Sequence, residues 1–378
     1  MLFHIYTCSF GSGHRRGAEK LGTSLDAYQV KVFDFLEELT PKWSNKIYEE
    51  YAKGMRTQGK AFNVYMWGDA HKKKVLPWLA PIKKLFFQSL DSKPLPLAYG
   101  ATYSFVAYLL SEYKKERKLN TPLITYVTDF TPHEVWVNEG TDLYVVNSNY
   151  TKKKLMELGV DKDKIVLPDK KVFPDKKIHE RPHLLVTGGG LGLLPEDSDF
   201  YFDLQERFQG EVRIICGSNS YLKEVLEMIL PKEFQVYGFV DNMEEQLDWA
   251  DICIGKAGGL TVYEALERGI PFGFFTPFLP QEERNGEFLT EEGLGFHIDE
   301  DNMYAVELPS VVKMEHMKVN MENELSTTPG ELVAGVEKVV LDYVDTYANL
   351  DSWNRPISVS KHLVQKVSAF RKGIRSHT

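Results

Sequence analysis

The stretch that decides the fold reads WADICIGKAGGLTVYEAL and spans residues 249–266. Its first part, residues 249–254, is apolar and predicts a β-strand, and residues 261–268 predict a helix. A strand, a Gly-Gly turn and a helix in this order place free backbone N–H groups at a helix N-terminus, where an anion is favoured. Because Gly258 and Gly259 have no Cβ atoms, a phosphate could approach this turn closely.

Two interpretations of this stretch are open when it is taken alone. In the first, the glycines only allow the helix to pack tightly on the strand. In the second, the turn is part of an anion site, Thr261 caps the helix or bonds a phosphate oxygen, and Glu264 reaches the hydroxyls of a ribose. The rest of the chain has to decide between them.

The composition is that of a globular protein with more than one domain. The chain has 378 residues, more than one hydrophobic core usually serves, and 43% of them are hydrophobic while 26% are charged. The formal net charge of -9 argues against general nucleic-acid binding. We therefore expect two domains and no nucleic-acid partner.

The three cysteines predict neither disulfides nor a metal site. Cys8, Cys216 and Cys253 each fall in an apolar run, far apart, with no CxxC or Cys/His spacing near them. The N-terminus lacks the layout of a signal peptide, and no apolar run approaches the roughly 18 residues that span a bilayer. These features predict a soluble, cytoplasmic protein.

The first half of the chain opens with a strand, a glycine-rich loop and a helix. Residues 2–9 predict the strand, the loop contains Gly11, Gly13 and His14, and residues 30–34 predict the next strand. This order gives a parallel sheet with the loop at the carboxyl edge of its first strand, where ligands bind in open α/β sheets. The loop matches neither a dinucleotide fingerprint nor a P-loop.

His14 and Asp129 are the candidate acid/base residues. A lone histidine is more often structural than catalytic, but His14 stands at a glycine turn that opens a helix, and its ordinary pKa suits proton abstraction near pH 7. Residues 122–129 predict a strand that ends in Asp129, on the same rim as His14 if the two strands are parallel. The alternative is that Asp129 only caps the next turn, where His133 follows.

Residues 41–100 concentrate lysines and aromatic side chains. In a chain of negative net charge, this predicts a surface for anionic lipid headgroups, and the alternative is an ordinary helical insert with a solvated lysine face. The residues proposed for that surface are Lys72, Lys73, Lys74, Trp78, Lys83, Lys84, Phe86 and Phe87. A basic, amphipathic helix at about residues 355–378 is predicted to pack back on the first domain or to lie on the membrane.

A polar, proline-punctuated stretch at residues 168–177 predicts the linker between a first domain (1–170) and a second domain (180–350). Strand and glycine loop recur after this linker, with Gly189 and Gly190 at the end of the strand that begins at residue 183. Two such loops in one domain and a third in the other indicate a phosphate-bearing ligand held between the domains.

Four motifs resemble, in order and spacing, the glycosyltransferases of the monogalactosyldiacylglycerol synthase and processive diacylglycerol glucosyltransferase group. The transferase that adds N-acetylglucosamine to lipid-linked muramyl-pentapeptide is a wider relative. The motifs are GSGH (residues 11–14), TDF (128–130), KAGGLT with EA (256–261 and 264–265), and PQE with N (280–282 and 285).

This resemblance implies an α/β protein of GT-B fold, with two Rossmann-like domains facing a central cleft. It implies an inverting transfer of a hexose from UDP-glucose or UDP-galactose to diacylglycerol or a related glycolipid, without a metal or cofactor. His14 would be the base and Asp129 would assist it, with Gly11, Gly13 and His133 in the acceptor and phosphate loop. The implied donor-binding residues are Gly189, Gly190, Asn219, Phe239, Gly258, Gly259, Thr261, Glu264, Gln281, Glu282 and Asn285.

Within this resemblance, Glu264 would bond the ribose, the Phe239 backbone would meet the uracil, and the Gln281-Glu282 pair with Asn285 would read the sugar. Taken alone, these last three residues are more simply helix-capping residues. The enzyme would work as a peripheral protein on the inner face of the cell membrane. The alternatives are a polyprenyl-linked or soluble acceptor, a UDP-sugar 2-epimerase, and a non-catalytic UDP-sugar or lipid-binding module.

Overall fold

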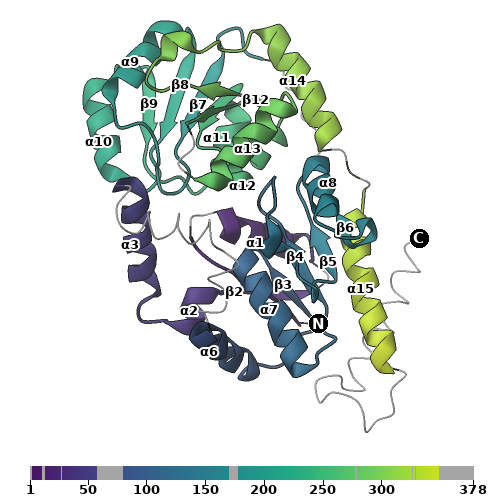
Figure 1. Cartoon of the computed structure of the whole chain (residues 1–378). Coiled ribbons are helices and arrows are strands. Elements are labelled where there is room, and N and C mark those ends of the chain that lie inside the picture. The colour runs from purple at the N-terminus through teal and green to yellow at the C-terminus, as the bar shows by residue number, and fades with distance from the viewer. Residues whose placement is uncertain are drawn as a thin grey trace.

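The computed structural model consists of two α/β units, each built on a parallel sheet (Figure 1). The residues it describes are 2–10, 13–26, 28–57, 80–169, 178–276, 279–325, 327 and 329–348. Within these ranges the first sheet has the strand order β2-β1-β3-β4-β5-β6, and the second has the order β12-β11-β10-β7-β8-β9. Neighbouring strands pair in parallel throughout both sheets. This confirms the predicted α/β class.

The first domain contains the N-terminal sheet and the helices around it. Its strands are β1 (Leu2–Thr7), β2 (Gln29–Asp34), β3 (Ala98–Ala101), β4 (Leu123–Tyr126), β5 (Leu143–Val145) and β6 (Ile165–Val166). Its helices are α1 (Gly13–Thr23), α2 (Phe35–Leu39), α3 (Ser44–Thr57), α6 (Ala80–Asp91), α7 (Ser104–Arg117) and α8 (Asn149–Glu157), with 3-10 turns at Glu134–Trp136 and Lys162–Lys164.

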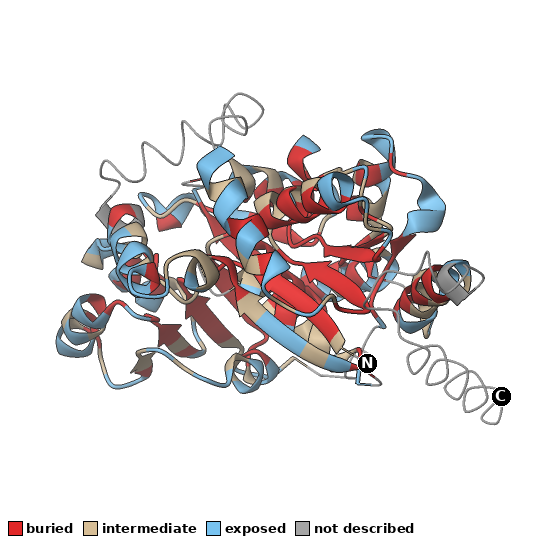
Figure 2. Ribbon diagram, turned by 90° about the horizontal axis from the view of Figure 1, so that it is seen from below, coloured by how far each residue is buried: buried red, intermediate tan, exposed pale blue. Residues whose placement is uncertain are grey.

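The second domain follows the same plan. Its strands are β7 (His183–Thr187), β8 (Glu211–Ile215), β9 (Phe234–Tyr237), β10 (Ile252–Gly255), β11 (Phe272–Phe275) and β12 (Gly295–Ile298). Its helices are α9 (Ser198–Arg207), α10 (Ser220–Ile229), α11 (Met243–Trp249), α12 (Gly259–Leu266), α13 (Pro280–Glu291) and α14 (Val311–Glu324), with a 3-10 turn at Met303–Ala305. In both domains most strands form the buried centre, with the edge strand β2 largely exposed, and exposed residues gather on the outer helices (Figure 2).

The strand orders create a ligand crevice in each domain. In the second sheet β7 and β10 are neighbours, although the chain leaves β7 toward β8 and returns to β10 on the other side. Such a switch point opens a crevice outside the carboxyl ends of the two strands, where open α/β sheets bind ligands. The glycine loops after β7 and β10 lie at this point. In the first sheet, the loop that leads to His14 lies at the corresponding point between β1 and β3.

Strand β3 occupies the middle of the first sheet, yet its sequence AYGA does not predict a strand. All four residues are buried between β1 and β4. A Cβ atom at Gly100 would lie 3.0 Å from the Ile5 side chain of β1, so the pairing of these strands depends on a residue without one. A glycine suits this crowded position, and together with the burial of all four residues it hides the usual pattern of a strand.

Helix α15 (Glu331–Ala348) returns to the first domain, beside β6 in Figure 1. Its side chains Val336, Val340 and Tyr343 belong to the same buried cluster as Ile5 and Val145. The prediction that the second domain extends to residue 350 is therefore wrong, because the apolar face of α15 is buried against the first sheet. The predicted helix at residues 355–378 lies outside the described residues.

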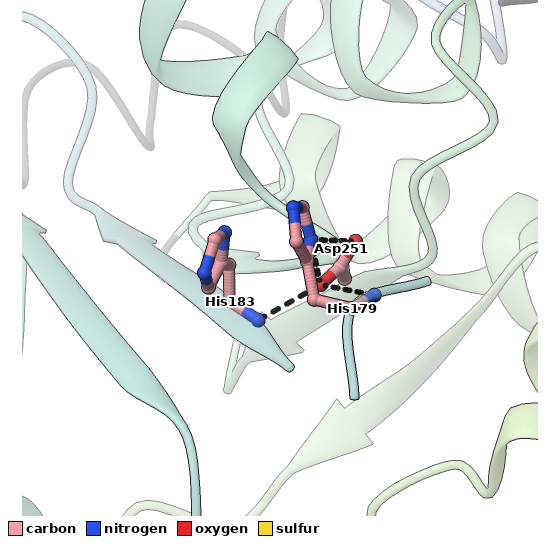
Figure 3. Close-up of side chains that lie close together, drawn as sticks. All are labelled: His179, His183 and Asp251. Carbon is pink, nitrogen blue, oxygen red and sulfur yellow. Dashed lines mark hydrogen bonds and ion pairs between the residues drawn. The ribbon is translucent and has the colours of Figure 1, made fainter. Parts of the chain in front are cut away.

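Asp251 ties the start of the second domain to β10 (Figure 3). Its buried carboxylate accepts hydrogen bonds from the backbone N–H of His183 and from Nδ1 of His179, both at 2.9 Å. The two imidazole rings stack with centroids 3.9 Å apart and planes 26° apart. To hold a metal ion, the nitrogen lone pairs of both rings would have to point at one position. In these stacked rings they lie along nearly parallel planes, so we interpret the group as a tether for the chain that enters β7.

Candidate functional site

Two hollows lie between the domains at the switch points of the sheets. The inner chamber has a volume of about 90 Å³, and its lining includes His14, Gly258 and Gln281. The outer cleft has a volume of about 630 Å³, and its lining includes Thr187 and Phe239. A larger open hollow of about 840 Å³, between α7 and residues 134–142, contains none of the predicted site residues. Many of the predicted donor-binding residues therefore line hollows between the domains.

His14 lies in the first turn of α1, after the carboxyl end of β1. Its Nδ1 lies 2.9 Å from the carbonyl oxygen of Thr102 and 3.1 Å from the hydroxyl oxygen of Thr128. Because a carbonyl only accepts, Nδ1 carries the proton, and Nε2 presents a lone pair. Burial lowers the pKa of His14 below its ordinary value of 6.5, while the charge of Asp129 acts to raise it. The ring is therefore neutral at pH 7 and can accept a proton.

Asp129 follows β4 and is held from both domains. The indole Nε1 of Trp136 donates to its Oδ2 at 2.7 Å, and the side-chain amide of Gln281, on α13, donates to its Oδ1. Nε2 of His133 lies 3.9 Å from the same Oδ2. The Asp129 side chain is only 6% exposed. The carboxylate is thus fixed in place near His14, whose pKa it influences through its charge rather than by a direct hydrogen bond.

The glycine loops have different structural reasons for their glycines. Gly189 has a positive φ of 65°, which favours glycine, and its missing side chain leaves room for the Lys256 side chain. A Cβ atom at Gly258 would meet only that lysine, at 3.5 Å. A Cβ atom at Gly259 would lie 2.0 Å from the carbonyl oxygen of Thr128 in the first domain. Gly259 is therefore needed for close contact between the domains, and Gly258 leaves the chamber open.

Glu264 contacts the facing domain. Its Oε2 accepts a hydrogen bond of 2.6 Å from Nη1 of Arg16 on α1, and Nη2 of Arg16 donates to the Thr261 hydroxyl at 3.1 Å. A parallel ion pair joins Lys20 and Glu267 at 2.8 Å. Burial raises the pKa of Glu264, and Arg16 acts to lower it. The residue predicted to bind ribose thus forms part of a charged contact between α1 and α12.

Helix α13 brings the other predicted sugar-reading residues to the chamber. Gln281 and Glu282 line it, and Glu282 accepts a hydrogen bond of 2.7 Å from Nζ of Lys256. Asn285 is buried, and its amide donates to the carbonyl oxygen of Ala257 at 2.7 Å while its oxygen accepts from the Phe130 N–H at 3.4 Å. These contacts favour a positioning role for Asn285 over the predicted contact with a sugar.

The remaining donor and acceptor residues lie in different surroundings. Asn219 caps α10: its oxygen accepts from the Leu222 N–H, and its amide lies 3.4 Å from the Gly192 carbonyl oxygen. It therefore supports the glycine loop after β7 instead of lining either hollow. Phe239 is exposed at the outer cleft. His133 caps the 3-10 turn that begins at the next residue, Glu134. Gly11 lies outside the described residues.

The predicted membrane surface is partly wrong. Phe86 and Phe87 on α6 are 0% and 4% exposed, because they pack into the core of the first domain, and they cannot meet lipid. The positive charge of Lys83 is balanced by ion pairs with Glu112 and Glu116 on α7. Lys84 is exposed. Lys72, Lys73, Lys74 and Trp78 lie outside the described residues. Of the helices that the structure describes, none has the length and hydrophobicity to cross a bilayer.

Sequence reasoning missed two cations at the site. Arg16 lies two residues after His14, and Lys256 opens the KAGGLT motif, so both stood within quoted motifs or directly beside them. Neither was assigned a role, because only the approach of the two domains brings Arg16 to Glu264, and only the folding of the second domain brings Lys256 to Glu282. Both roles could have been predicted from the sequence, because basic residues stand next to loops that were expected to hold an anion.

Family comparisons agree with this geometry. Residues 14–167 match the model of monogalactosyldiacylglycerol (MGDG) synthase, and residues 183–338 match the glycosyltransferase family 28 C-terminal domain. The two halves of the chain are therefore each similar to a glycosyltransferase family model. The resemblance stated from the four motifs is confirmed.

Individual relatives extend over most of the chain. A protein of Bacillus licheniformis named processive diacylglycerol beta-glucosyltransferase is 25% identical over 361 residues, covering 87% of this chain and 92% of its own length. One of the same name from Bacillus cereus is 23% identical, covering 85% and 88%.

Solved structures agree in fold. The calicheamicin glycosyltransferase CalG4 matches with a TM-score of 0.59 at 13% identity, covering 92% of this chain and 99% of that chain. MurG of Acinetobacter baumannii matches with a TM-score of 0.50 at 15% identity, covering 89% and 98%. The predicted GT-B fold is confirmed.

Proposed function

We propose that this glycosyltransferase moves a hexose from a UDP-sugar to the hydroxyl of diacylglycerol or a related membrane glycolipid, with inversion at the anomeric carbon. The observation that carries the proposal is the position of His14, which lines the same chamber as Gly258 and Gly259 and whose Nδ1 is held by the Thr102 carbonyl oxygen. A base and an anion-binding turn therefore share one chamber between the domains. The names of the Bacillus relatives supply the acceptor class.

In the reaction, Nε2 of His14 removes the proton from the acceptor hydroxyl. The oxygen attacks the anomeric carbon while the bond from that carbon to the diphosphate breaks, so one displacement inverts the centre and releases UDP. The negative charge of Asp129 stabilises the imidazolium that forms. Trp136 and Gln281 keep that carboxylate in place.

On the donor side, backbone N–H groups at the N-terminus of α12 and at the loop after β7 offset the diphosphate charge. Glu264 binds the ribose hydroxyls after Arg16 releases it, and the backbone near Phe239 meets the uracil. Gln281 and Glu282 recognise the sugar. No metal or cofactor takes part in this proposal, so excess EDTA should leave the turnover unchanged, and a loss restored by a divalent cation would contradict it.

For the acceptor, we propose that the first domain rests on the inner face of the membrane. Trp43, beside α3, is 60% exposed, and Ile47 on α3 is also exposed. Apolar side chains of this kind, with the lysines at positions 72–74 and 84, suit an anionic lipid surface. Trp43→Ser together with serine at these lysines should reduce sedimentation with phosphatidylglycerol vesicles. Unchanged sedimentation would contradict this surface.

The donor sugar is proposed to be UDP-glucose or UDP-galactose. The relatives are named glucosyltransferases, whereas the family model of the first domain is named for a galactolipid. Purified protein should be incubated with each UDP-sugar, with and without diacylglycerol, and both the lipid and the nucleotide products measured. UDP release that requires the lipid supports the transfer. An epimerised donor without lipid, or no turnover of any donor, would contradict it.

A further inference from the structure

Lys256 extends into the inner chamber between the two glycine loops of the second domain. It follows β10 directly, and its Cε lies 3.6 Å from where a Cβ atom of Gly189 would be and 3.5 Å from that of Gly258. Both positions lack a side chain, so the lysine stem lies along the open space that they leave. The ammonium group therefore lies beside the two loops to which we assign the diphosphate.

A buried carboxylate holds this ammonium in place. Nζ of Lys256 lies 2.7 Å from Oε1 of Glu282, whose side chain is 3% exposed, whereas the Lys256 side chain is 25% exposed. The lysine is thus anchored on its protein side and still open to the chamber. A charge fixed in this way needs little reorganisation when a ligand arrives.

Among the described residues that line the chamber, the basic side chains are Lys256, His14 and Arg16. The two terminal nitrogens of Arg16 are engaged by Glu264 and Thr261. Lys256 is therefore the cation that the donor domain itself supplies to the chamber.

We infer that Lys256 binds the diphosphate of the donor and offsets the charge that develops as UDP leaves, with Glu282 as its positioning residue. When the bond to the anomeric carbon breaks, the β-phosphate oxygen keeps the electron pair, and the diphosphate gains one negative charge. An ammonium at this point stabilises that charge more than it stabilises the bound substrate. This inference rests on the proposed function.

The test compares UDP with uridine, since uridine lacks the phosphates. In calorimetry, Lys256→Met should weaken UDP binding about ten- to hundredfold, the range for a charge-assisted hydrogen bond, and leave uridine binding unchanged. Lys256→Arg should keep more UDP affinity than Lys256→Met. Lys318→Met on α14, which removes a lysine paired with Glu315 in the same domain, is the matched control and should change neither ligand.

Lys256→Met alone leaves the buried Glu282 carboxylate without this partner, which can destabilise the fold. The double variant Lys256→Met/Glu282→Gln removes both charges and should show the same selective loss of UDP with a normal circular dichroism spectrum. Equal UDP affinity in the wild type and the double variant would overturn the inference. A wild type that binds neither UDP nor uridine would instead overturn the proposed function.

Discussion

Arg16 and Glu264 form a 2.6 Å ion pair across the cleft, although 248 positions separate them in the sequence. Arg16 stands on α1 of the first domain, two residues after His14, and Glu264 stands on α12 of the second. The pair therefore connects the helix that carries the proposed base with the helix that carries the proposed ribose-binding residue. If Glu264 binds the ribose as proposed, the ribose hydroxyls share with Arg16 a carboxylate that Arg16 contacts through Oε2.

The first prediction concerns the ribose. Glu264→Ala should weaken UDP binding by about 1–3 kcal/mol, the range for hydrogen bonds to a charged group, as measured by calorimetry. Glu267→Ala is the matched control, because it removes the neighbouring ion pair to Lys20 but no proposed ribose contact. Equal losses in both variants would show that domain contact, and not ribose binding, explains the effect.

The second prediction concerns the base. His14→Ala should lower kcat by about 10²–10⁴-fold, the usual contribution of a positioned base, while UDP affinity stays near that of the wild type. His316→Ala, at an exposed position on α14, should change neither quantity. A His14 variant that lost donor affinity in proportion to its turnover would place this residue in the donor site instead.

The third prediction concerns pH. His14 works as a base only when neutral, and because burial lowers its pKa, activity should fall only as the pH drops below about 6.5. Asp129 acts to raise that pKa, so Asp129→Asn should move the acidic limb of kcat/KM to still lower pH while reducing kcat. A limb that stays in place or moves to higher pH would contradict the electrostatic role of Asp129.

The fourth prediction separates two adjacent glycines. Gly259→Ala places a Cβ atom 2.0 Å from the Thr128 carbonyl oxygen, so the domains have to move apart. A displacement of about 1 Å at the reacting groups can cost roughly 10²-fold in rate, and we expect a loss of that order in kcat/KM with both domains still folded. Gly258→Ala, whose Cβ would meet only the Lys256 side chain, should keep the domain contact. Similar scattering profiles and rates for the two variants would contradict this assignment.

Sequence patterns predicted the elements whose signal is local. The apolar run before the Gly-Gly turn, the glycine loop after residue 187 and the first strand are all found close to their predicted positions. Strand β3 was missed because all four of its residues are buried, which removes the alternation of polar and apolar residues, and because the crowded position 100 requires a glycine. Helix α15 was assigned to the second domain, because nothing in its own sequence states which sheet covers its apolar face.

The site was predictable as a set of motifs, but not as a set of contacts. His14, Gly258 and Gln281 were chosen from sequence and do line one chamber. The partners that define their chemistry come from the opposite domain or from distant loops, such as Thr102 for His14 and Asp129 for Gln281. Phe86 was expected on a surface because aromatic residues beside lysines look the same whether a helix face is buried or exposed.

The most direct test of the proposed function is the mass of the lipid, with the anomeric configuration of the new linkage read by NMR, after purified protein is incubated with UDP-glucose or UDP-galactose and diacylglycerol vesicles. The account predicts a lipid heavier by one hexose, joined by a β-linkage because the donors are α-linked and the transfer inverts. It also predicts that the His14→Ala variant forms far less of this product. An unmodified lipid with intact donor, or an α-linked product, would contradict it.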